Sequence, residues 1–377
     1  MQEPMRIVVA GGGIGGVSAA IALRRAGFDA QLFERAPELR EVGAALSLWP
    51  NATRILREWG VLAPLLRVAH APPTFEVRSW RGERLQRVPL QEADAPTLFV
   101  HRADLLAALA DALPPWALHL GAELESFSES AEGVVARFRD WGEADGAALV
   151  GADGLHSTTR RLVLDDGAPV YRGYPVWRGV ACLEHPAIGG SASETLGPGR
   201  RAGVLPLGDG RVAWWATANE PEGTPDGNRK ARLLRLFGNW HAPIPQLIEA
   251  TPGDEILKNA TCDRPPRRTW GRGRVTLLGD AAHPTTPNLG QGGCLAIEDA
   301  AVLARALARE PDVPAALRAY ERRRYPRTAA ITRMSHRLGS VGQWERPLAV
   351  ATRGALFRLT PAWAARLSLR RVNAFRP

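Results

Sequence analysis

The sequence is poor in cysteine and in long apolar runs. Its 377 residues include three cysteines, Cys182, Cys262 and Cys294, which are odd in number and widely separated. This excludes a disulfide framework and the ligand spacing of a structural metal site, so we expect no metal. No apolar run reaches the about 20 residues that span a bilayer, and the first expected strand begins too early for a signal peptide. We therefore expect a soluble, cytoplasmic protein.

Lysine is almost missing as well. Of 48 basic residues only Lys230 and Lys258 are lysines, and the net charge of +9 is concentrated from Ile331 onward, where nine arginines accompany one acid, Glu345. The remainder is nearly neutral and shows no basic, aromatic-lined module, so we expect no nucleic-acid partner. For the tail we expect C-terminal helices with solvated arginine faces. The alternative is a basic amphipathic segment in peripheral contact with anionic lipid. Its apolar side would hold Leu348, Ala355, Leu356, Leu359 and Trp363.

Glycine, in contrast, is abundant and clusters at two places about 270 residues apart. Near the N-terminus the apolar run Arg6–Ala10 leads into GGGIGG and then into an alanine-rich helix. Gly11 permits the tight turn, Gly13 lets the backbone approach a pyrophosphate, and Gly16 lets helix and strand pack closely. A second strand delivers Glu34, whose carboxylate can bind ribose hydroxyls. This pattern predicts a parallel strand–turn–helix unit that binds an adenine dinucleotide.

The second glycine cluster also follows an apolar strand. Val275 to Leu278 leads into Gly279 and Asp280, and then into AAHPTTPNLGQGG, which ends at Gly293. It offers a carboxylate at a strand end and a loop that can approach a planar ring closely. A nicotinamide dehydrogenase needs only the first cluster, whereas a protein that retains a flavin has reason to carry both. The pair predicts non-covalently bound FAD.

Strand and helix signals alternate along the chain, which predicts an α/β fold with interleaved domains. We expect a helix over 51–66, a hairpin of 74–80 with 83–90, paired strands at 133–139 and 147–150, and a β-rich stretch over 173–219.

Three motifs follow one another along this chain: GGGIGG at 11–16, GADG at 151–154, and GD at 279–280 with its continuation PNLGQGG. In this order and spacing they resemble the single-component FAD-dependent aromatic hydroxylases, the family of para-hydroxybenzoate hydroxylase. Within that family the sequence is most similar to the branch of FAD-dependent urate hydroxylase and zeaxanthin epoxidase. The resemblance implies a Rossmann-like FAD-binding domain formed by 1–70, 97–165 and 271–330, a mixed β-sheet substrate domain formed by 71–96 and 166–270, and a C-terminal helical segment, 331–377.

The resemblance also implies which positions hold FAD. Glu34 and Arg35 would lie on its ADP half, Ser47 and Leu124 along the flavin, and Arg102 near the pyrophosphate. Asp153 belongs to a motif that serves both FAD and NAD(P)H, and Asp280 would bind the ribityl hydroxyls. The full set is Gly11, Gly13, Ile14, Gly15, Gly16, Glu34, Arg35, Ser47, Arg102, Leu124, Asp153, Gly279, Asp280, Gly290, Gln291, Gly292 and Gly293.

For the chemistry, the resemblance implies a flavoprotein monooxygenase. NADPH or NADH would bind transiently and reduce FAD, and O2 would then form a flavin hydroperoxide whose distal oxygen enters an aromatic or heteroaromatic small molecule. The protein must exclude water, but it needs no catalytic dyad or triad of its own, and we name no catalytic side chain. Glu41 and Gly43 stand where para-hydroxybenzoate hydroxylase has arginine for nicotinamide recognition, so the choice between NADH and NADPH stays open.

The resemblance implies substrate contacts from the β-rich middle, where Arg178 and Arg201 match positions that face the substrate in urate-hydroxylating relatives, and from the second glycine cluster. Two arginines suit an anionic or carbonyl-rich ring, and tryptophans can stack on it. An alternative for the Trp214–Trp215 pair is that strand alternation turns one ring into the core and the other outward. Asn288 stands where urate-hydroxylating relatives carry a carboxylate, so urate itself is not expected. The expected contacts are Arg178, Arg201, Trp177, Trp214, Pro287 and Asn288.

Three other classes share this fold or cofactor. An epoxidase of lipophilic, carotenoid- or polyprenoid-like alkenes would use the same oxygen chemistry and is the main alternative. A flavin-dependent halogenase is nearly excluded, because it needs an active-site lysine and a WxWxIP stretch, and no lysine precedes Lys230. A non-catalytic FAD-binding scaffold would not need the complete PNLGQGG loop.

Overall fold

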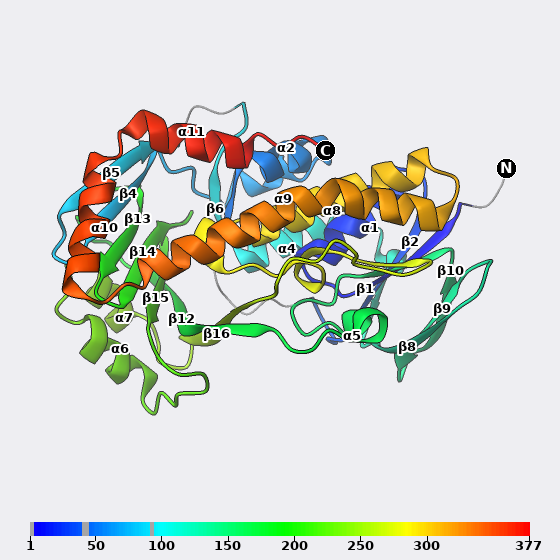
Figure 1. Ribbon diagram of the computed structural model, residues 1–377, viewed down its shortest axis with the longest axis horizontal. Helices are drawn as coiled ribbons and strands as arrows, with labels where there is room; N and C mark the ends of the chain where they lie inside the picture. The colour runs from blue at the N-terminus through cyan, green and yellow to red at the C-terminus, as the bar shows by residue number, and fades with distance from the viewer. Residues whose placement is uncertain (1–3, 40–44, 91–93) are drawn as a thin grey trace.

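The computed structural model describes residues 4–39, 45–90 and 94–377. Glu41 and Gly43, which stand where para-hydroxybenzoate hydroxylase has arginine for nicotinamide recognition, lie outside these residues. Figure 1 shows two sheet-containing parts, one at each end of an elongated molecule, with a long helix running past both. Across the described part of the chain, no helix is long and apolar enough to cross a membrane.

One part is built on a five-stranded sheet in which every pair of neighbours is parallel. Its order is β17 (Val275–Leu277), β11 (Ala148–Gly151), β1 (Arg6–Ala10), β2 (Asp29–Glu34) and β7 (Leu118–Leu120). Side chains alternate along β1, so that Ile7 and Val9 face a helical layer while Val8 faces a second, three-stranded sheet. Both faces are therefore covered, as the apolar run in β1 requires.

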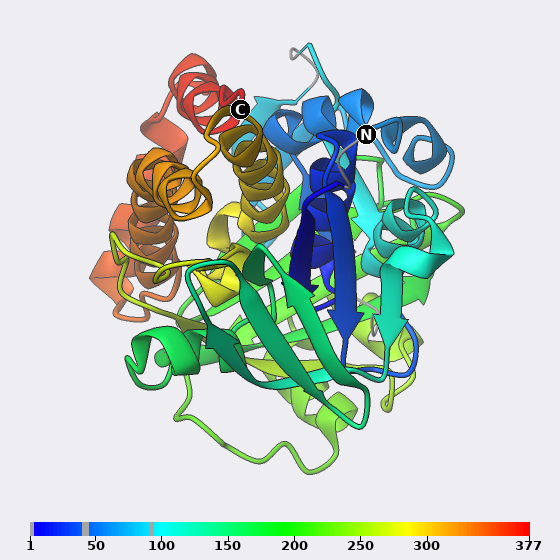
Figure 2. The same cartoon turned by 90° about the vertical axis from the view of Figure 1, so that its right-hand side faces the viewer.

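The three-stranded sheet consists of β8 (Glu123–Glu129), β9 (Val134–Arg139) and β10 (Gly142–Gly146), and Figure 2 shows it in front of the parallel sheet. The expected pairing of 133–139 with 147–150 is wrong. β9 pairs with β8 and β10, whereas β11 joins the parallel sheet between β1 and β17. Ala148 to Val150 are fully buried on both faces, which a central parallel strand requires and a hairpin strand does not.

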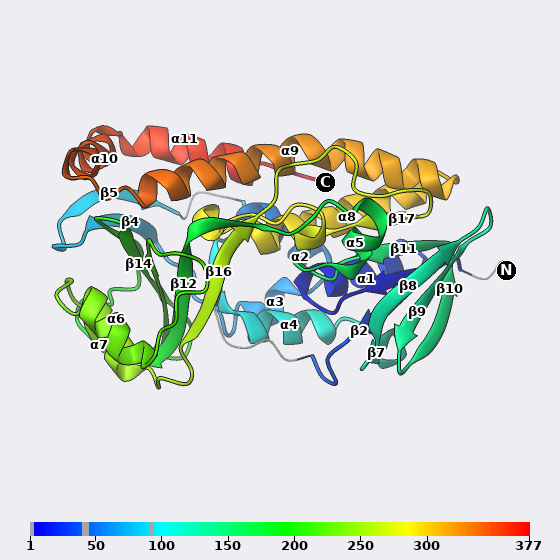
Figure 3. The same cartoon turned by 60° about the horizontal axis from the view of Figure 1, so that its bottom comes forward.

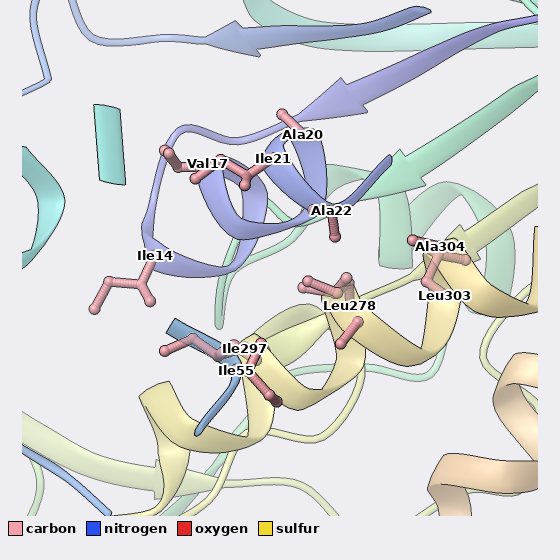
Figure 4. Close-up of a cluster of buried hydrophobic side chains, with 14 of the residues drawn as sticks. Ile14, Val17, Ala20, Ile21, Ala22, Ile55, Leu278, Ile297, Leu303 and Ala304 are labelled. Carbon is pink, nitrogen blue, oxygen red and sulfur yellow. The ribbon is translucent and has the colours of Figure 1, made fainter. Parts of the chain in front are cut away.

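The helical layer holds α1 (Ile14–Arg25), α2 (Pro50–Glu58), α3 (Leu62–Leu65), α4 (Arg102–Ala110) and α8 (Gly292–Arg309). Figure 4 shows α1 and α8 side chains meeting across their seam, Ile14 and Ile297 among them. The single helix expected over 51–66 is wrong, because it breaks between α2 and α3. Gly60 has φ +81°, a left-handed conformation that ends a helix.

The other part is a mixed seven-stranded sheet, and it contains the expected hairpin as β4 and β5. Helices α6 (Arg229–Phe237) and α7 (Ile244–Ala250) cover one face, while the opposite face meets β3 (Ala45–Leu48) and β6 (Leu98–His101) of the first part. The strand order is β16 (Leu257–Asp263), β12 (Val170–Cys182), β15 (Arg211–Ala218), β14 (Arg200–Pro206), β13 (Ala192–Gly197), β4 (Thr74–Ser79) and β5 (Arg84–Pro89).

The long helix is α9 (Val313–Gly342), which has 30 residues and is capped by Asp312, whose carboxylate accepts from the Ala315 N–H at 2.9 Å. Helices α10 (Pro347–Leu359) and α11 (Ala362–Asn373) fold back beside it (Figure 3). The domain boundary expected at residue 330 falls inside α9. The last segment thus begins as the continuation of a helix that spans both parts. The short α5 (Thr158–Leu164) completes the helices of the described chain.

Candidate functional site

The two glycine clusters meet at the carboxyl edge of the parallel sheet, where β1, β2, β11 and β17 end. At this edge α1 and α8 begin next to each other, since a Cβ placed on Gly293 would lie 3.8 Å from Ile14 Cδ1. The positive ends of both helix dipoles therefore lie at this edge of the sheet, next to each other. Such an edge is where α/β sheets bind phosphates and nucleotides.

A cavity of about 250 Å³ opens at the ends of β1 and β2. Glu34 stands at its wall, oriented by backbone N–H groups of Gly12 at 2.5 Å and Ala36 at 2.8 Å. The predicted positions Gly11, Gly13, Arg35, Leu124 and Asp153 line the same cavity. Leu124 therefore lies at the Glu34 end, away from Ser47. Leu124 thus shares a cavity with Glu34, and its expected place along the flavin stays a prediction.

The glycines of GGGIGG have three different reasons to be glycine. Gly11 has φ +110° and lies against the Ala152 carbonyl, and a Cβ on Gly16 would lie 1.7 Å from the Gly11 carbonyl oxygen. A Cβ on Gly13 would meet no protein atom within 4 Å. Gly11 and Gly16 thus shape the loop itself, whereas Gly13 leaves space open on the side where a ligand approaches.

Asp153 has a local structural task. Its carboxylate accepts from the Ser157 hydroxyl at 2.5 Å and from the Thr159 N–H and hydroxyl at 2.9 and 3.0 Å. These bonds fasten the GADG turn to the N-terminus of α5, where Ser157 is the cap. The motif contributes its backbone to the cavity, while the carboxylate holds the turn in place.

The GD turn rests on buried ionic groups. The Gly279 N–H and His283 Nε2 both contact Asp299 Oδ2, at 3.0 and 2.6 Å, and Arg324 donates to the other oxygen of Asp299 at 2.5 Å. Burial alone would raise the pKa of Asp299, but the charges of His283 and Arg324 and their hydrogen bonds lower it. The network was not predicted from the sequence, although two of its members, His283 in DAAH and Asp299 in EDA, lie in or near the GD motif.

Asp280 projects from this turn towards the site. Its side chain stays accessible to solvent through the opening, yet protein atoms surround it densely, and this desolvation raises its pKa in spite of the charges of His283 and Arg102. A carboxylate held in this way is a strong acceptor for ligand hydroxyls. A Cβ on Gly292 would lie 4.0 Å from Asp280 Oδ1, so the GD turn and the start of α8 border one space.

The far end of this space is formed by Gly290, Ser47 and Trp49. Gly290 has φ +59°, and a Cβ there would lie 3.1 Å from Trp49 Nε1 and 3.3 Å from the Ser47 hydroxyl. The Trp49 indole N–H is buried and has no hydrogen-bond partner among the described residues. An unpaired buried donor beside a glycine-rich loop fits a polar, planar ligand edge. Trp49 was not predicted, although it stands in the stretch ALSLWPN next to Ser47.

Among the substrate candidates, Arg201 is the most constrained. Its guanidinium is buried and donates to Gln343 at 2.9 Å, to Glu194 at 3.0 Å and to Asn288 at 2.7 Å. It also lies 5.5 Å from the ring centroids of Tyr174 and Trp215. Arg201 is therefore a fixed cation whose orientation is set from three sides.

Arg178 lies on the same face of the seven-stranded sheet and donates to Asn259 at 3.0 Å. Desolvation and the nearby charge of Arg102 lower its pKa to about 10, which leaves it charged near neutral pH. Because Arg102 also interacts with Asp280, it electrostatically connects the cofactor cradle with the arginine-bearing face.

Trp177 and Trp214 lie on the face of the seven-stranded sheet opposite to Arg178 and Arg201. Both are buried against α6 and α7, where Trp177 donates to Asp226 at 3.1 Å and Trp214 donates to Thr251 at 2.8 Å. The expectation for these two residues is corrected, and the Trp214–Trp215 pair splits as strand alternation demands. Trp215 is the half-buried ring on the arginine side, directly opposite Arg178 in the strand register.

The wall opposite this face comes from α9 and the PNL turn. Asn288 donates to the Ser335 carbonyl at 2.9 Å and accepts from Arg201, and Pro287 precedes it in the same turn. A Cβ on Gly339 would lie 2.4 Å from Asn288 Nδ2, and one on Gly342 would lie 2.8 Å from Arg201 Cδ. Glycines on α9 thus let this helix close over the site. Sequence analysis did not predict a role for α9 here.

Together these groups fit FAD: an acidic strand end with an open glycine, two helix N-termini, an acceptor at Asp280, and an unpaired indole N–H by Gly290. No group of three or more His, Cys, Asp or Glu side chains able to hold a metal ion occurs in residues 4–39, 45–90 and 94–377.

Comparison with known proteins agrees with this geometry. Residues 5–167 and 249–335 match the family model described as "FAD binding domain". "Aurachin C monooxygenase/isomerase" of Stigmatella aurantiaca is 43% identical over 364 residues, 95% of each chain. "3-amino-4-hydroxybenzoate 2-monooxygenase" of Streptomyces cremeus is 38% identical over 349 residues, 90% of this chain and 88% of the relative. The solved structure of Klebsiella pneumoniae HpxO complexed with FAD and uric acid has a TM-score of 0.92 at 29% identity and covers 98% of this chain and 97% of that one.

Proposed function

This chain belongs to the family that shares the FAD binding domain and is a flavoprotein monooxygenase, and we propose that it uses NADPH or NADH to insert one oxygen atom from O2 into an aromatic or heteroaromatic small molecule. The named activities of its relatives support the reaction class. The reductant binds transiently and leaves, because the one dinucleotide-binding fingerprint in the sequence, GGGIGG, is used by FAD.

When bound, FAD stores the two electrons of the reductant and activates O2 at its ring. The residues of this chain bind and orient. The starts of α1 and α8 would hold its phosphates and ring, the carboxylates of Glu34 and Asp280 would accept from its hydroxyls, and Trp49 would offer its N–H beside Gly290. Pre-oriented donors of this kind favour negative charge on the reduced ring without having to reorganise.

For the substrate we propose a planar ring that carries an anionic or carbonyl group. One observation supports this most directly: Arg201 and Arg178 stand on the sheet face that meets the cofactor cradle, and Arg102 interacts with both Asp280 and Arg178. Trp215 adds an aromatic surface between the two arginines. The packing of α9 on Arg201 and Asn288 keeps bulk water from this wall, which protects the oxygen-transfer step.

The test uses two neighbouring arginines on opposite faces of β14. Arg201→Ala removes a cation from the proposed substrate wall, whereas Arg200 donates to the Leu236 carbonyl on the α6 side, which makes Arg200→Ala the matched control. Losing a charge-assisted contact of this kind costs roughly 2–5 kcal/mol, or about 30-fold to several thousand-fold in KM. We expect Arg201→Ala alone to raise KM and hydrogen peroxide release while FAD content stays unchanged.

Substrates are found by screening phenols, heteroaromatic acids and lipophilic alkenes for stimulated oxygen consumption, and labelled oxygen gas must mark the product. If both variants keep the coupling of the parent, Arg201 does not contact the substrate. Label that enters only from water would contradict the monooxygenase assignment itself.

A further inference from the structure

An ordinary surface helix buries apolar side chains and exposes charged ones, whereas helix α10 buries a charged side chain. Within this fully described helix Arg353 is the one buried residue, and its guanidinium donates to the carbonyls of Val341, Gly342 and Gly197. Phe357 also faces the protein and packs against the cluster of Val77, Leu85 and Leu196. Other apolar side chains of α10 point outward, with Leu348 81% and Leu359 78% exposed. The helix is therefore held to the protein through Arg353 and Phe357, while an apolar side that includes Leu348 and Leu359 faces away from it.

The exposed apolar surface continues onto α11. Leu348, Thr352, Ala355 and Leu359 follow one another at helical spacing along α10, and Trp363, at the start of α11, is 68% exposed. Beside Trp363 a groove of about 520 Å³ runs between α9 and α11, lined by Ile331, Met334, Leu367 and Val372 among others. We call the outer side chains Leu348, Leu356, Leu359, Trp363 and Leu367 the α10–α11 surface. Contiguous exposed apolar side chains of this kind mark an interaction site.

The charge that the α10–α11 segment itself contributes has one sign, although Arg358 pairs with Glu83 at 2.8 Å. Residues 346–377 contain seven arginines and no aspartate, glutamate or lysine. Arg346, Arg358, Arg370 and Arg371 are exposed beside the apolar side chains. An apolar surface surrounded by arginine is complementary to a layer whose interior is hydrocarbon and whose surface is anionic.

We propose that the α10–α11 surface docks the protein on an anionic phospholipid bilayer, with the leucines and Trp363 in the interface and the arginines at the lipid phosphates. Contact is peripheral, because no helix in the described residues could span the bilayer. A second copy of this chain fits the surface less well. A two-fold contact would place the same arginine-rich patch on both sides and set like charges against each other. The proposal goes beyond the monooxygenase reaction and does not depend on it.

The experiment measures flotation of the FAD-loaded full chain with vesicles of phosphatidylcholine, with and without phosphatidylglycerol. We expect binding to the anionic vesicles only. Raising the salt from about 0.1 M to about 1 M, where the Debye length falls from about 10 Å to about 3 Å, should release the protein. Leu359→Ser should weaken binding about tenfold, because a leucine no longer enters the interface. Arg346→Gln combined with Arg371→Gln should weaken it in anionic vesicles by a similar factor.

Matched controls separate docking from general damage. Leu66 is 51% exposed and lies away from α10 and α11, so Leu66→Ser makes the same chemical change elsewhere. Arg67→Gln with Arg235→Gln removes the same charge from other exposed positions. All variants should keep the flavin absorbance and melting temperature of the parent. Absence of vesicle binding by the parent, or equal binding by Leu359→Ser and Leu66→Ser, would overturn the proposal. So would a concentration-dependent dimer that Leu359→Ser abolishes, since a second copy would then be the occupant.

Discussion

The half of the site that fits the cofactor is made mostly of backbone, whereas the half that we propose for the substrate is made of side chains. At the parallel sheet, glycines and helix N-termini form the cradle, and the Glu34 carboxylate at its wall is itself held by backbone N–H groups. On the seven-stranded sheet, Arg201 is held by Glu194, Gln343 and Asn288, which come from three separate segments.

The difference implies that the two halves can change independently. A backbone cradle tolerates few substitutions, since a Cβ added at Gly11 or Gly16 meets a carbonyl oxygen and one added at Gly13 fills space left open for a ligand. A side-chain wall, in contrast, can be altered residue by residue. Substrate preference can then change among relatives without loss of FAD. The predictions below test whether cofactor retention and substrate coupling separate in this way.

The largest effect is expected beneath the GD turn. Arg324 is fully buried and pairs with Asp299 at 2.5 Å and with Glu298 at 2.7 Å. Arg324→Leu leaves two buried carboxylates short of a partner, which costs roughly 3–5 kcal/mol. Because Asp299 also holds the Gly279 N–H, FAD should be lost as well. Urea unfolding and flavin absorbance measure both.

Arg323→Leu is the control for this change, since Arg323 neighbours Arg324 on α9 but is exposed. Its unfolding free energy should stay within about 0.5 kcal/mol of the parent. Equal stability of the two variants would show that the buried network does not support the turn.

The next effect distinguishes two glycines of one motif. In Gly13→Ala the new Cβ meets no protein atom within 4 Å and the backbone φ of −71° is ordinary, so stability should not change. The methyl group stands where the pyrophosphate would approach, and FAD affinity should fall by about tenfold or more, the equivalent of a charge-assisted hydrogen bond of roughly 1.5–3 kcal/mol. Titration of the apoprotein with FAD measures this loss.

In Gly16→Ala the added Cβ collides with the Gly11 carbonyl instead. Overpacking should lower the unfolding free energy by roughly 1–3 kcal/mol even without FAD. If Gly13→Ala destabilised the apoprotein as strongly, the open side of the loop would not be the ligand side.

A smaller, pH-dependent effect comes from Asp299. Its folded pKa lies below the ordinary 3.8, because His283 and Arg324 outweigh the effect of burial. A lowered carboxylate pKa stabilises the folded state above pH 3.8, and this contribution is lost as the pH falls through the folded pKa. The difference in unfolding free energy between the parent and Asp299→Asn should therefore shrink below pH 3.8. A difference that stays constant with pH would contradict the assigned charges.

The separation into backbone and side-chain halves also explains what the sequence could predict. Gly11, Gly13 and Glu34 lie within one strand–turn–helix unit, so their spacing alone predicted that they would line one cavity. The GD motif could be predicted as well, because Gly279 and Asp280 directly follow the strand that positions them. The role of Asp153 was less visible, because its carboxylate caps α5 while its backbone lines the cavity.

The substrate half depends on contacts that no local pattern contains. Arg201 meets Gln343 across 142 positions, and the face of Trp177 depends on which side of the sheet α6 and α7 cover. Alternation predicted that Trp214 and Trp215 would point to opposite faces, but not which of them would be buried. For Trp214 and Trp177 the choice made from the sequence was wrong. The part played by α9 was missed because its glycines matter only through packing against Asn288 and Arg201.

The smallest expected effect concerns the two adjacent tryptophans. Trp214→Phe loses the hydrogen bond to Thr251 inside the core and should lower the unfolding free energy by about 1 kcal/mol with no change in substrate KM. In Trp215→Phe the phenyl ring still faces the Arg201 guanidinium, so this contact inside the protein is largely kept. The variant reduces the ring surface on which we propose that the substrate stacks, which should cost about 0.5–1 kcal/mol of binding. It should therefore raise KM about two- to fivefold and leave stability unchanged. Steady-state kinetics and urea unfolding of both variants form one experiment. If Trp214→Phe were the variant with the altered KM, the face of the sheet that we assign to the substrate would be the wrong one.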